Sequence, residues 1–152
     1  MRAHLAVQPH HERAFLDLGV EPADPGAASV LAAPLGTGDW QEALDGLTAL
    51  YRSCRMAAEH GSPVVFLVSS DALLGRTGPL DAMAAMGVVS AARTLALELR
   101  KQQIPVNCVG FTENTPAEEV ATWVLRLLQS GAAGPTGELL QLGGVQIGKA
   151  LS

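Results

Sequence analysis

Two serines and two aspartates are the residues of this sequence best placed to do chemistry. Ser69 and Ser70 directly follow the apolar run at residues 64–68, Asp71 comes next, and Asp81 opens a long run of good helix formers. A serine at the end of a buried strand can bind a carbonyl oxygen or, beside a general base, act as a nucleophile. Without a partner acid or base these serines cannot be activated. Turn and helix-capping roles therefore compete with chemical ones, and Asp81 stands where a helix N-cap is expected.

Three other residue pairs imitate known sites. His10 and His11 suggest a metal, but adjacent side chains diverge and no third ligand stands at ligand spacing, which favours solvated loop histidines. The pair Gly36 and Gly38 is too short for a phosphate-binding motif and indicates a strand-to-helix turn. Tyr51 and Arg55 are one helical turn apart and form an ordinary helix-surface pair. The sequence therefore predicts no metal or phosphate site.

The elements that must position these residues follow from the apolar pattern. Short apolar runs predict strands at residues 2–8, 28–34, 64–68, 104–109 and 136–142, and apolar residues at helical spacing predict helices at 11–18, 40–58, 81–100 and 117–129. Asp39 with Glu42 predicts a capping box before the second helix. Strands alternating with helices favour parallel pairing. We expect one α/β domain, a cut-down Rossmann-type three-layer fold with a parallel sheet of about five strands.

Several motifs in order resemble one enzyme family. Leu95-Ala96-Leu97-Glu98 followed by Ile104-Pro105-Val106-Asn107, then the helix start at residues 116–121 and the strand with two glycines at 136–144, resemble the short-chain dehydrogenase/reductase family. The resemblance covers about residues 29–144. It implies a truncated domain of that family, in which residues 1–27 are a degenerate remnant of the nucleotide-binding half, 28–144 the core and 145–152 a tail.

The catalytic Tyr-x-x-x-Lys of this family has no counterpart. Aligned on residues 95–98, the tyrosine falls at Asp81 and the lysine at Ala85; aligned on Ser70, they fall near Met83 and Gly87. The sequence holds one tyrosine and two lysines, none at that spacing. The family's chemistry needs a phenol made acidic by a nearby ammonium, which Asp and Ala cannot supply. Ser70, Asp81 and Ala85 are thus predicted to be degenerate catalytic positions.

The cofactor cradle of the family is also missing. The family has a glycine-rich turn after its first strand, whereas residues 8–12 here contain no glycine. Glycine is needed there because the backbone must approach the pyrophosphate. The family's structural asparagine would fall near Asp45 or Gly46, and the loop at residues 110–116 is too short for a lid. We therefore expect no NAD(P) to be bound by this chain.

Composition favours a protein that is partly covered by another subunit. Of 152 residues, 48% are apolar and 16% charged, which leaves little charge for a free surface. The net charge of -5 argues against nucleic acid and acidic membranes as partners. No run reaches the roughly 18 apolar residues of a membrane span, and no signal peptide is evident. The two cysteines lie in apolar patterns and are expected to be buried without forming a disulfide. The expected compartment is therefore the cytoplasm.

These observations lead to one main hypothesis and two alternatives. The main hypothesis is a non-catalytic subunit that supports a catalytic short-chain dehydrogenase in a heterotetramer, with NAD(P) in the partner; the resemblance suggests a hydroxyacyl-CoA dehydrogenase of anaerobic aromatic degradation, such as the benzylsuccinate pathway. The first alternative is an enzyme with rebuilt chemistry around Ser69, Ser70 and Asp81. The second is a self-associating binding module. The predicted interface residues are Trp40, Leu47, Tyr51, Met83, Met86, Gly87, Ser90, Trp123, Leu140 and Leu142.

Overall fold

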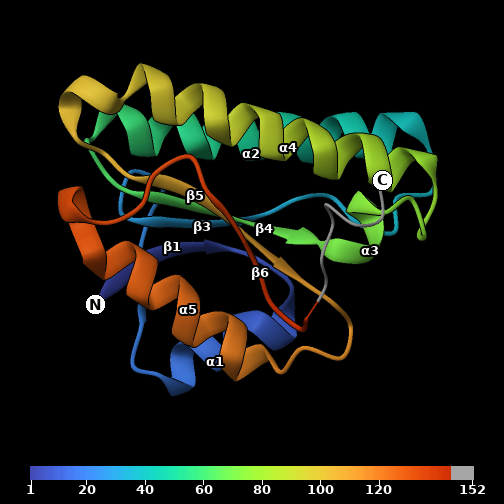
Figure 1. Cartoon of the computed structure of the whole chain (residues 1–152), viewed down its shortest axis with the longest axis horizontal. Helices are drawn as coiled ribbons and strands as arrows, with labels where there is room; N and C mark the ends of the chain where they lie inside the picture. The colour runs from blue at the N-terminus through green and yellow to red at the C-terminus, as the bar shows by residue number, and fades with distance from the viewer. Residues whose placement is uncertain (145–152) are drawn as a thin grey trace.

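The chain forms one parallel sheet in strand order β2-β1-β3-β4-β5-β6, seen in a computed structural model that describes residues 1–144 (Figure 1). The predicted tail at residues 145–152 lies outside the described residues. Six strands replace the expected five, because the short β2 forms in a segment whose prolines and glycine predicted only a connector. The strands are β1 (Arg2–Ala6), β2 (Glu21–Pro22), β3 (Ser29–Ala32), β4 (Val64–Ser69), β5 (Val106–Phe111) and β6 (Leu139–Gln141).

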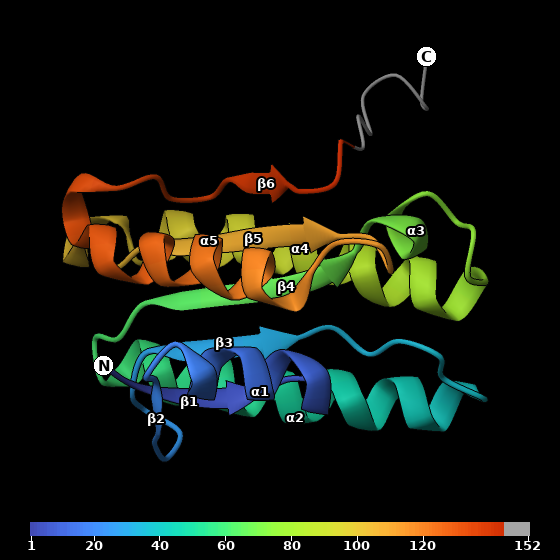
Figure 2. The ribbon, with the colours of Figure 1, turned by 90° about the horizontal axis from the view of Figure 1, so that it is seen from below.

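Helices cover both faces of the sheet, which confirms the three-layer α/β fold. Helices α1 and α5 lie on one face and α2 and α4 on the other (Figures 1 and 2). The short α3 follows β4 directly. The helices are α1 (Pro9–Asp17), α2 (Trp40–Glu59), α3 (Ser70–Leu73), α4 (Pro79–Glu98) and α5 (Ala117–Ser130), with 3-10 turns at Arg100–Gln102 and Gly131–Ala133.

The central strands β4 and β5 are buried on both faces, as their unbroken apolar runs require. Alternate side chains, such as Val65 and Val109, join the core beneath α1 and α5. Their neighbours, such as Phe66 and Cys108, join the core beneath α2 and α4. Because consecutive side chains point to opposite faces of a strand, one segment supplies both cores. Because both faces of the sheet are covered by helices, a binding site can form only at an edge of the sheet, such as its carboxyl edge.

Helix α4 begins earlier than expected. Its first residue is Pro79, preceded by Gly78 with a φ of 126°, so Asp81 lies within the first turn and is not the N-cap. Proline at the first helical position suits the start of a helix, because its missing N–H would be unpaired there anyway. By length and composition α4 could also cross a membrane, which the sequence reading had excluded. Seven of its twenty residues are buried in this fold.

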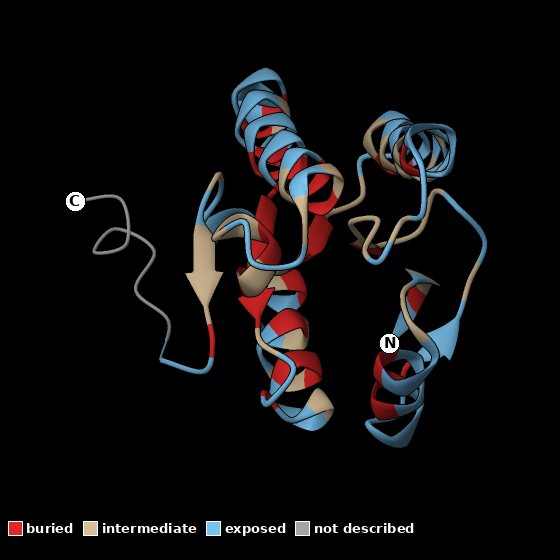
Figure 3. Cartoon of the chain, turned by 90° about the vertical axis from the view of Figure 1, so that its right-hand side faces the viewer, coloured by how far each residue is buried: buried red, intermediate tan, exposed pale blue. Residues whose placement is uncertain are grey.

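Helix α2 is only lightly packed on the rest of the chain. Its start confirms the predicted capping box in part: Asp39 accepts a hydrogen bond from the Glu42 amide at 2.9 Å, while Glu42 accepts one from the Gly38 amide rather than from Asp39. Of its twenty residues only Ala43 and Ala57 are buried. Figure 3 shows this helix coloured almost entirely as intermediate or exposed. A long helix of this kind leaves apolar side chains facing solvent.

Candidate functional site

The candidate site is the carboxyl edge of the sheet. Strand order reverses between β1 and β3, since the chain passes from β1 outward to β2 and then returns to the other side of β1. Ligands of open α/β sheets bind in the crevice at such a reversal, beyond the carboxyl ends of the strands. Ser69, the last residue of β4, and Ser70, the first of α3, lie at this edge, and Asp81 is bonded to the turn that follows β3 there.

Ser70 is held by the last strand. Its side chain is fully buried and its hydroxyl donates a hydrogen bond of 2.6 Å to Oε1 of Gln141. Gly110 leaves the space that Gln141 occupies, because a Cβ at position 110 would collide with the Gln141 side chain. Ser69 accepts a hydrogen bond of 3.2 Å from the Ala72 amide and so caps α3. Both serines therefore have structural partners, and neither is bonded to an acid or base in the described part of the chain.

Asp81 of helix α4 is hydrogen-bonded to the turn after β3. Its carboxylate is 4% exposed and accepts hydrogen bonds from the Gly36 amide at 3.0 and 3.1 Å. Oδ1 also accepts from the Thr37 amide at 3.3 Å and the Thr37 hydroxyl at 3.2 Å. Sequence analysis missed this role, because nothing in the pattern links residues 45 positions apart. The position that the family resemblance assigned to the catalytic tyrosine is thus occupied by a buried anchor.

The other predicted relay positions carry no reactive group. Ala85 is buried in helix α4, while Met83 and Gly87 from the alternative alignment face solvent. Tyr51 lies on the exposed side of α2, and its neighbour Arg55 forms an ion pair of 2.7 Å with Glu59. Among the described residues no hydrogen bond joins Ser70 to Asp81. The structure therefore does not assemble the proposed Ser69, Ser70 and Asp81 set into one site.

A cavity of about 310 Å³ lies at the carboxyl edge beside these residues. No group of three or more metal-binding side chains forms within residues 1–144. The cavity lies where the ends of β3, β4 and β5 meet the start of α1. It is lined by Gln8, His10, His11, Leu35, Ser69, Asp71, Thr77, Phe111, Thr112, Glu113 and Thr115.

His11 differs most from its sequence-based prediction. Both histidines lie in the first turn of α1 rather than in a loop, and whereas His10 is exposed, His11 is 2% exposed. The His11 ring lies 4.0 Å from the ring of His10 and 4.7 Å, edge on, from Phe111. Its Nδ1 atom is buried and has no hydrogen-bond partner in the described structure. Burial, and secondly the nearby His10, lower the pKa of His11 from 6.5 to about 4.

The lowered pKa of His11 predicts that the fold weakens in mild acid. The unfolded chain takes up a proton at the ordinary pKa of 6.5 and the folded chain only at about 4. The His11 contribution to stability is therefore complete above pH 6.5 and is lost as the pH falls to about 4, a change of about 3 kcal/mol. Urea unfolding from pH 7.5 to 4.5 measures it. His11→Phe should flatten this part of the profile, and an unchanged profile would contradict the assignment.

The two cysteines are free, as expected from the sequence. Burial raises the pKa of Cys108 to about 12, and burial together with Glu98 raises the pKa of Cys54 to about 11. The thiolate is the nucleophilic form, so both thiols are unreactive near neutral pH. Neither cysteine contributes a catalytic group.

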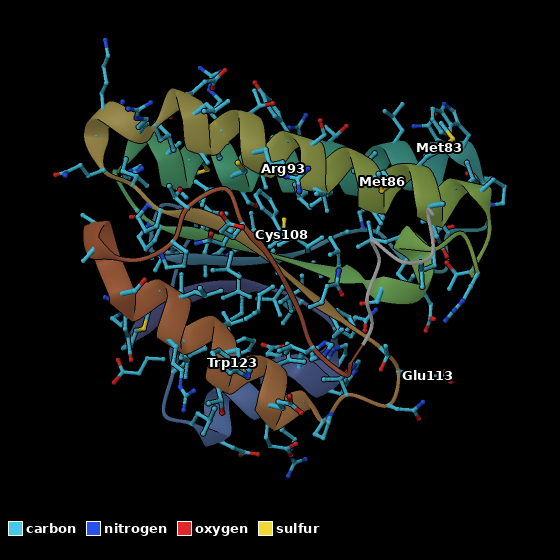
Figure 4. All side chains as sticks on the ribbon, viewed as in Figure 1. Met83, Met86, Arg93, Cys108, Glu113 and Trp123 are labelled. Atoms are coloured by element: carbon cyan, nitrogen blue, oxygen red, sulfur yellow. The ribbon has the colours of Figure 1, made fainter. Side chains whose placement is uncertain are left out.

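The predicted interface residues fall into three groups. Trp40, Tyr51, Met83, Met86, Gly87 and Ser90 are exposed on α2 and α4, where Leu47 is half-buried. Trp123 is exposed on α5, on the opposite face of the sheet from Met83 and Met86 (Figure 4), and Leu140 is half-buried in β6. The prediction of Leu142 as an interface residue is wrong: it is 5% exposed and packs in the core with α5.

Comparison with known proteins finds one partial relative in sequence. No protein-family profile matches the chain. The 3-oxoacyl-[acyl-carrier-protein] reductase FabG of Aggregatibacter actinomycetemcomitans is 32% identical in an alignment of 85 residues that covers 50% of this chain and 34% of that protein. The chain thus spans about a third of that curated relative.

Solved structures match over most of the chain. A short-chain dehydrogenase/reductase of the glucose/ribitol dehydrogenase type from Brucella melitensis matches with a TM-score of 0.72 and 19% identity over 96% of both chains. An oxidoreductase from Brucella ovis matches with a TM-score of 0.69 and 13% identity, over 93% of this chain and 99% of that one. The acetoin dehydrogenase YohF from Salmonella typhimurium gives 0.69 and 13% over 95% of both. The fold of this chain is therefore that of the short-chain dehydrogenases and reductases.

Proposed function

We propose that the chain is a non-catalytic subunit that assembles with a catalytically complete short-chain dehydrogenase. The observation that carries this proposal is Asp81: in the alignment on residues 95–98, the position of the catalytic tyrosine holds a buried carboxylate that is bonded to Gly36 and Thr37. In the alternative alignment this position holds Met83, which has no group that transfers a proton. Ala85 stands at the aligned lysine position. Proton transfer to a carbonyl oxygen needs a group within hydrogen-bond reach of the substrate, and neither residue offers one. The partner would supply NAD(P) and the reaction.

The docking surface is formed by α2 and α4. Eleven large hydrophobic side chains among the described residues are exposed, and seven of them lie on these two helices. Clustered exposed apolar groups mark protein interfaces. The light packing of α2 supports the same conclusion, because a partner would cover the apolar side chains that the chain leaves open. We define the α2–α4 surface as Trp40, Leu44, Tyr51, Met56, Met83, Met86 and Leu97.

The proposal predicts a stable hetero-oligomer. Co-expression with a dehydrogenase encoded beside this chain should give a complex that co-purifies, with the light-scattering mass of a heterotetramer. The isolated chain should have a smaller mass and should shift to the larger one when the partner is added. A homo-oligomer whose mass the partner does not change would contradict the proposal and would favour the self-associating module.

The proposal also predicts that the isolated chain does not bind nicotinamide dinucleotides. The segment after β1 contains no glycine and leads into α1 through Gln8 and Pro9, so the backbone cannot approach a pyrophosphate as a glycine turn does. Fluorescence titration with NADH and NADPH should give no saturation below about 1 mM. The complex with its partner is the control and should bind with ordinary affinity. Micromolar binding by the chain alone would contradict the prediction.

The name of the relative that matches in sequence supports a proposal for the partner's substrate class. That relative is named as a reductase of 3-oxoacyl groups on acyl-carrier protein. We propose that the partner interconverts 3-oxoacyl and 3-hydroxyacyl thioesters, such as the hydroxyacyl-CoA intermediates of aromatic degradation. The purified complex, assayed with 3-hydroxyacyl-CoA and NAD(P), tests this. The rebuilt-enzyme alternative is less well supported, since Ser70 and Asp81 are each occupied by structural hydrogen bonds.

A further inference from the structure

A hollow lies between the end of α4 and the segment that leads into β6, away from the carboxyl edge of the sheet. Its volume is about 270 Å³, and it is lined by Arg93, Ala96, Leu97, Arg100, Thr136 and Gly137. A second hollow, of about 290 Å³, lies at the amino end of β5 and also has Arg100 and Thr136 in its lining. The two hollows therefore meet at these two residues. None of the predicted catalytic positions lines either hollow.

Two arginines flank the first hollow. Arg93 lies on α4 and Arg100 in the 3-10 turn that follows it, seven residues later. Seven residues are close to two helical turns, so both side chains leave the same side of the chain. Ala96 stands between them, and its Cβ would be only 3.5 Å from a Cβ added at Gly137. Two small residues thus form the floor of the hollow and leave space between the guanidinium groups.

Neither arginine has an ionic partner within residues 1–144, where the two ion pairs use other arginines. The acidic residues nearest in sequence, Glu98 and Glu138, line different cavities, beside α2 and α5. Burial raises the pKa of the Cys108 thiol to about 12, and the charge of Arg93 opposes this shift, so Arg93 lies close to β5 (Figure 4). In a chain with a net charge of -5, this is a local concentration of positive charge.

The Thr136 hydroxyl adds a third donor to this lining. Its oxygen accepts a hydrogen bond of 3.1 Å from the Val106 amide, and its own proton is bonded to no acceptor in the described part of the chain. A hydroxyl that already accepts from an amide still has its proton to donate. Each arginine offers a rigid fork of donors and stays charged at every relevant pH. The lining of the hollow thus combines positive charge and free donors with no carboxylate.

We propose that the first hollow binds the phosphate group of a small phosphate monoester. Such a group carries nearly two negative charges near neutral pH and has three oxygens that accept hydrogen bonds. Arg93 and Arg100 bind it from two sides, and Thr136 donates a further hydrogen bond. The organic part of the ligand lies in the adjoining hollow, against Ile104 and Pro105. A carboxylate, with one charge and two oxygens, would leave some of these donors unused.

The proposal does not rest on the docking function. Of the α2–α4 surface, only Leu97 also borders the hollow. The isolated chain is sufficient for every measurement below, so the outcome is the same whether or not a catalytic partner exists.

Three probes separate the charge of the ligand from its shape. Phenyl phosphate is a monoester, benzenesulfonate keeps the ring and three oxygens with a single charge, and inorganic phosphate lacks the ring. Each is titrated at pH about 7.5 and constant ionic strength into the full ¹⁵N-labelled chain. Phenyl phosphate should shift the backbone amides of Ala96, Arg100 and Gly137 in a saturable way, and should bind about fivefold tighter than either other probe. Equal or tighter binding of another probe, or no saturable shift at these residues, would overturn the proposal.

Two single variants test the arginines themselves. Both side chains are exposed, so Arg93→Gln and Arg100→Gln should fold as the wild type does. Each removes one charged fork and should weaken the binding of phenyl phosphate about tenfold. The matched control is Arg52→Gln on α2, which removes the same charge from an exposed position outside the lining of the hollow and should leave binding unchanged. Wild-type affinity in either α4-side variant, or an equal loss in Arg52→Gln, would refute the site.

Discussion

A Met86→Glu variant is expected to lose its association with the catalytic partner and to keep its own fold. The Met86 side chain is 52% exposed and lies one turn from Met83, which is 58% exposed. In the proposed complex both would be buried, so the new carboxylate would lose water without gaining a partner. The cost of an unpaired charge at an interface is several kcal/mol, which corresponds to a loss of affinity of about 100-fold or more.

The matched control for this variant is on the other side of the sheet. Leu16 on α1 is 44% exposed, so Leu16→Glu makes the same kind of change away from the α2–α4 surface. Analytical ultracentrifugation of each variant with the partner measures the affinity, and circular dichroism of the isolated chains confirms their folding. If Met86→Glu bound as tightly as wild type, or if Leu16→Glu also lost binding, the assignment of the docking surface would be wrong.

The second large effect is expected at Asp81. Asp81→Ala removes the acceptor for the Gly36 and Thr37 amides and the Thr37 hydroxyl, and leaves a small cavity at a position that is 4% exposed. Hydrogen bonds to a charged acceptor contribute about 1.5–3 kcal/mol, and water can replace part of this at the half-open turn. We expect Asp81→Ala to lower the free energy of unfolding by about 2–3 kcal/mol in urea denaturation.

Asp81→Asn is the matched control, because its Oδ1 can still accept from the same donors. It should lose only about 1 kcal/mol, the difference between a charged and a neutral acceptor. Amide hydrogen exchange at Gly36 and Thr37 gives a local measurement: both amides should exchange faster in Asp81→Ala and little faster in Asp81→Asn. Equal stability of Asp81→Ala and wild type would show that the carboxylate does not hold the turn.

Most of the fold could be predicted because its signals are local. The apolar runs of β4 and β5, the capping of α2 by Asp39 and the spacing of α5 each lie within a few residues. β2 could not be predicted, since Glu21–Pro22 carries no strand pattern and pairs only because β1 passes beside it. The start of α4 was misplaced because an aspartate near a helix start suggests a cap, whereas proline after Gly78 marks the true beginning.

The candidate site was less predictable because its contacts join distant segments. Alignment to the family showed that the catalytic tyrosine and lysine are absent. It could not show that Ser70 bonds to Gln141 of β6, or that Asp81 bonds to the turn after β3. His11 was predicted to be solvated because a histidine in a polar stretch usually is. It is buried because Phe111, a hundred positions later, packs on it. Such contacts leave no trace in the local pattern.

The anchor at Asp81 has a consequence for how this lineage can change. A single mutation that placed tyrosine at position 81 would release the turn at Gly36 and Thr37 and would force a large ring into a filled space. Under the proposed non-catalytic role, a variant with a tyrosine at this position would therefore be less stable before it gained any activity. Selection would remove such intermediates, so a chain of this kind would not readily acquire dehydrogenase chemistry one mutation at a time.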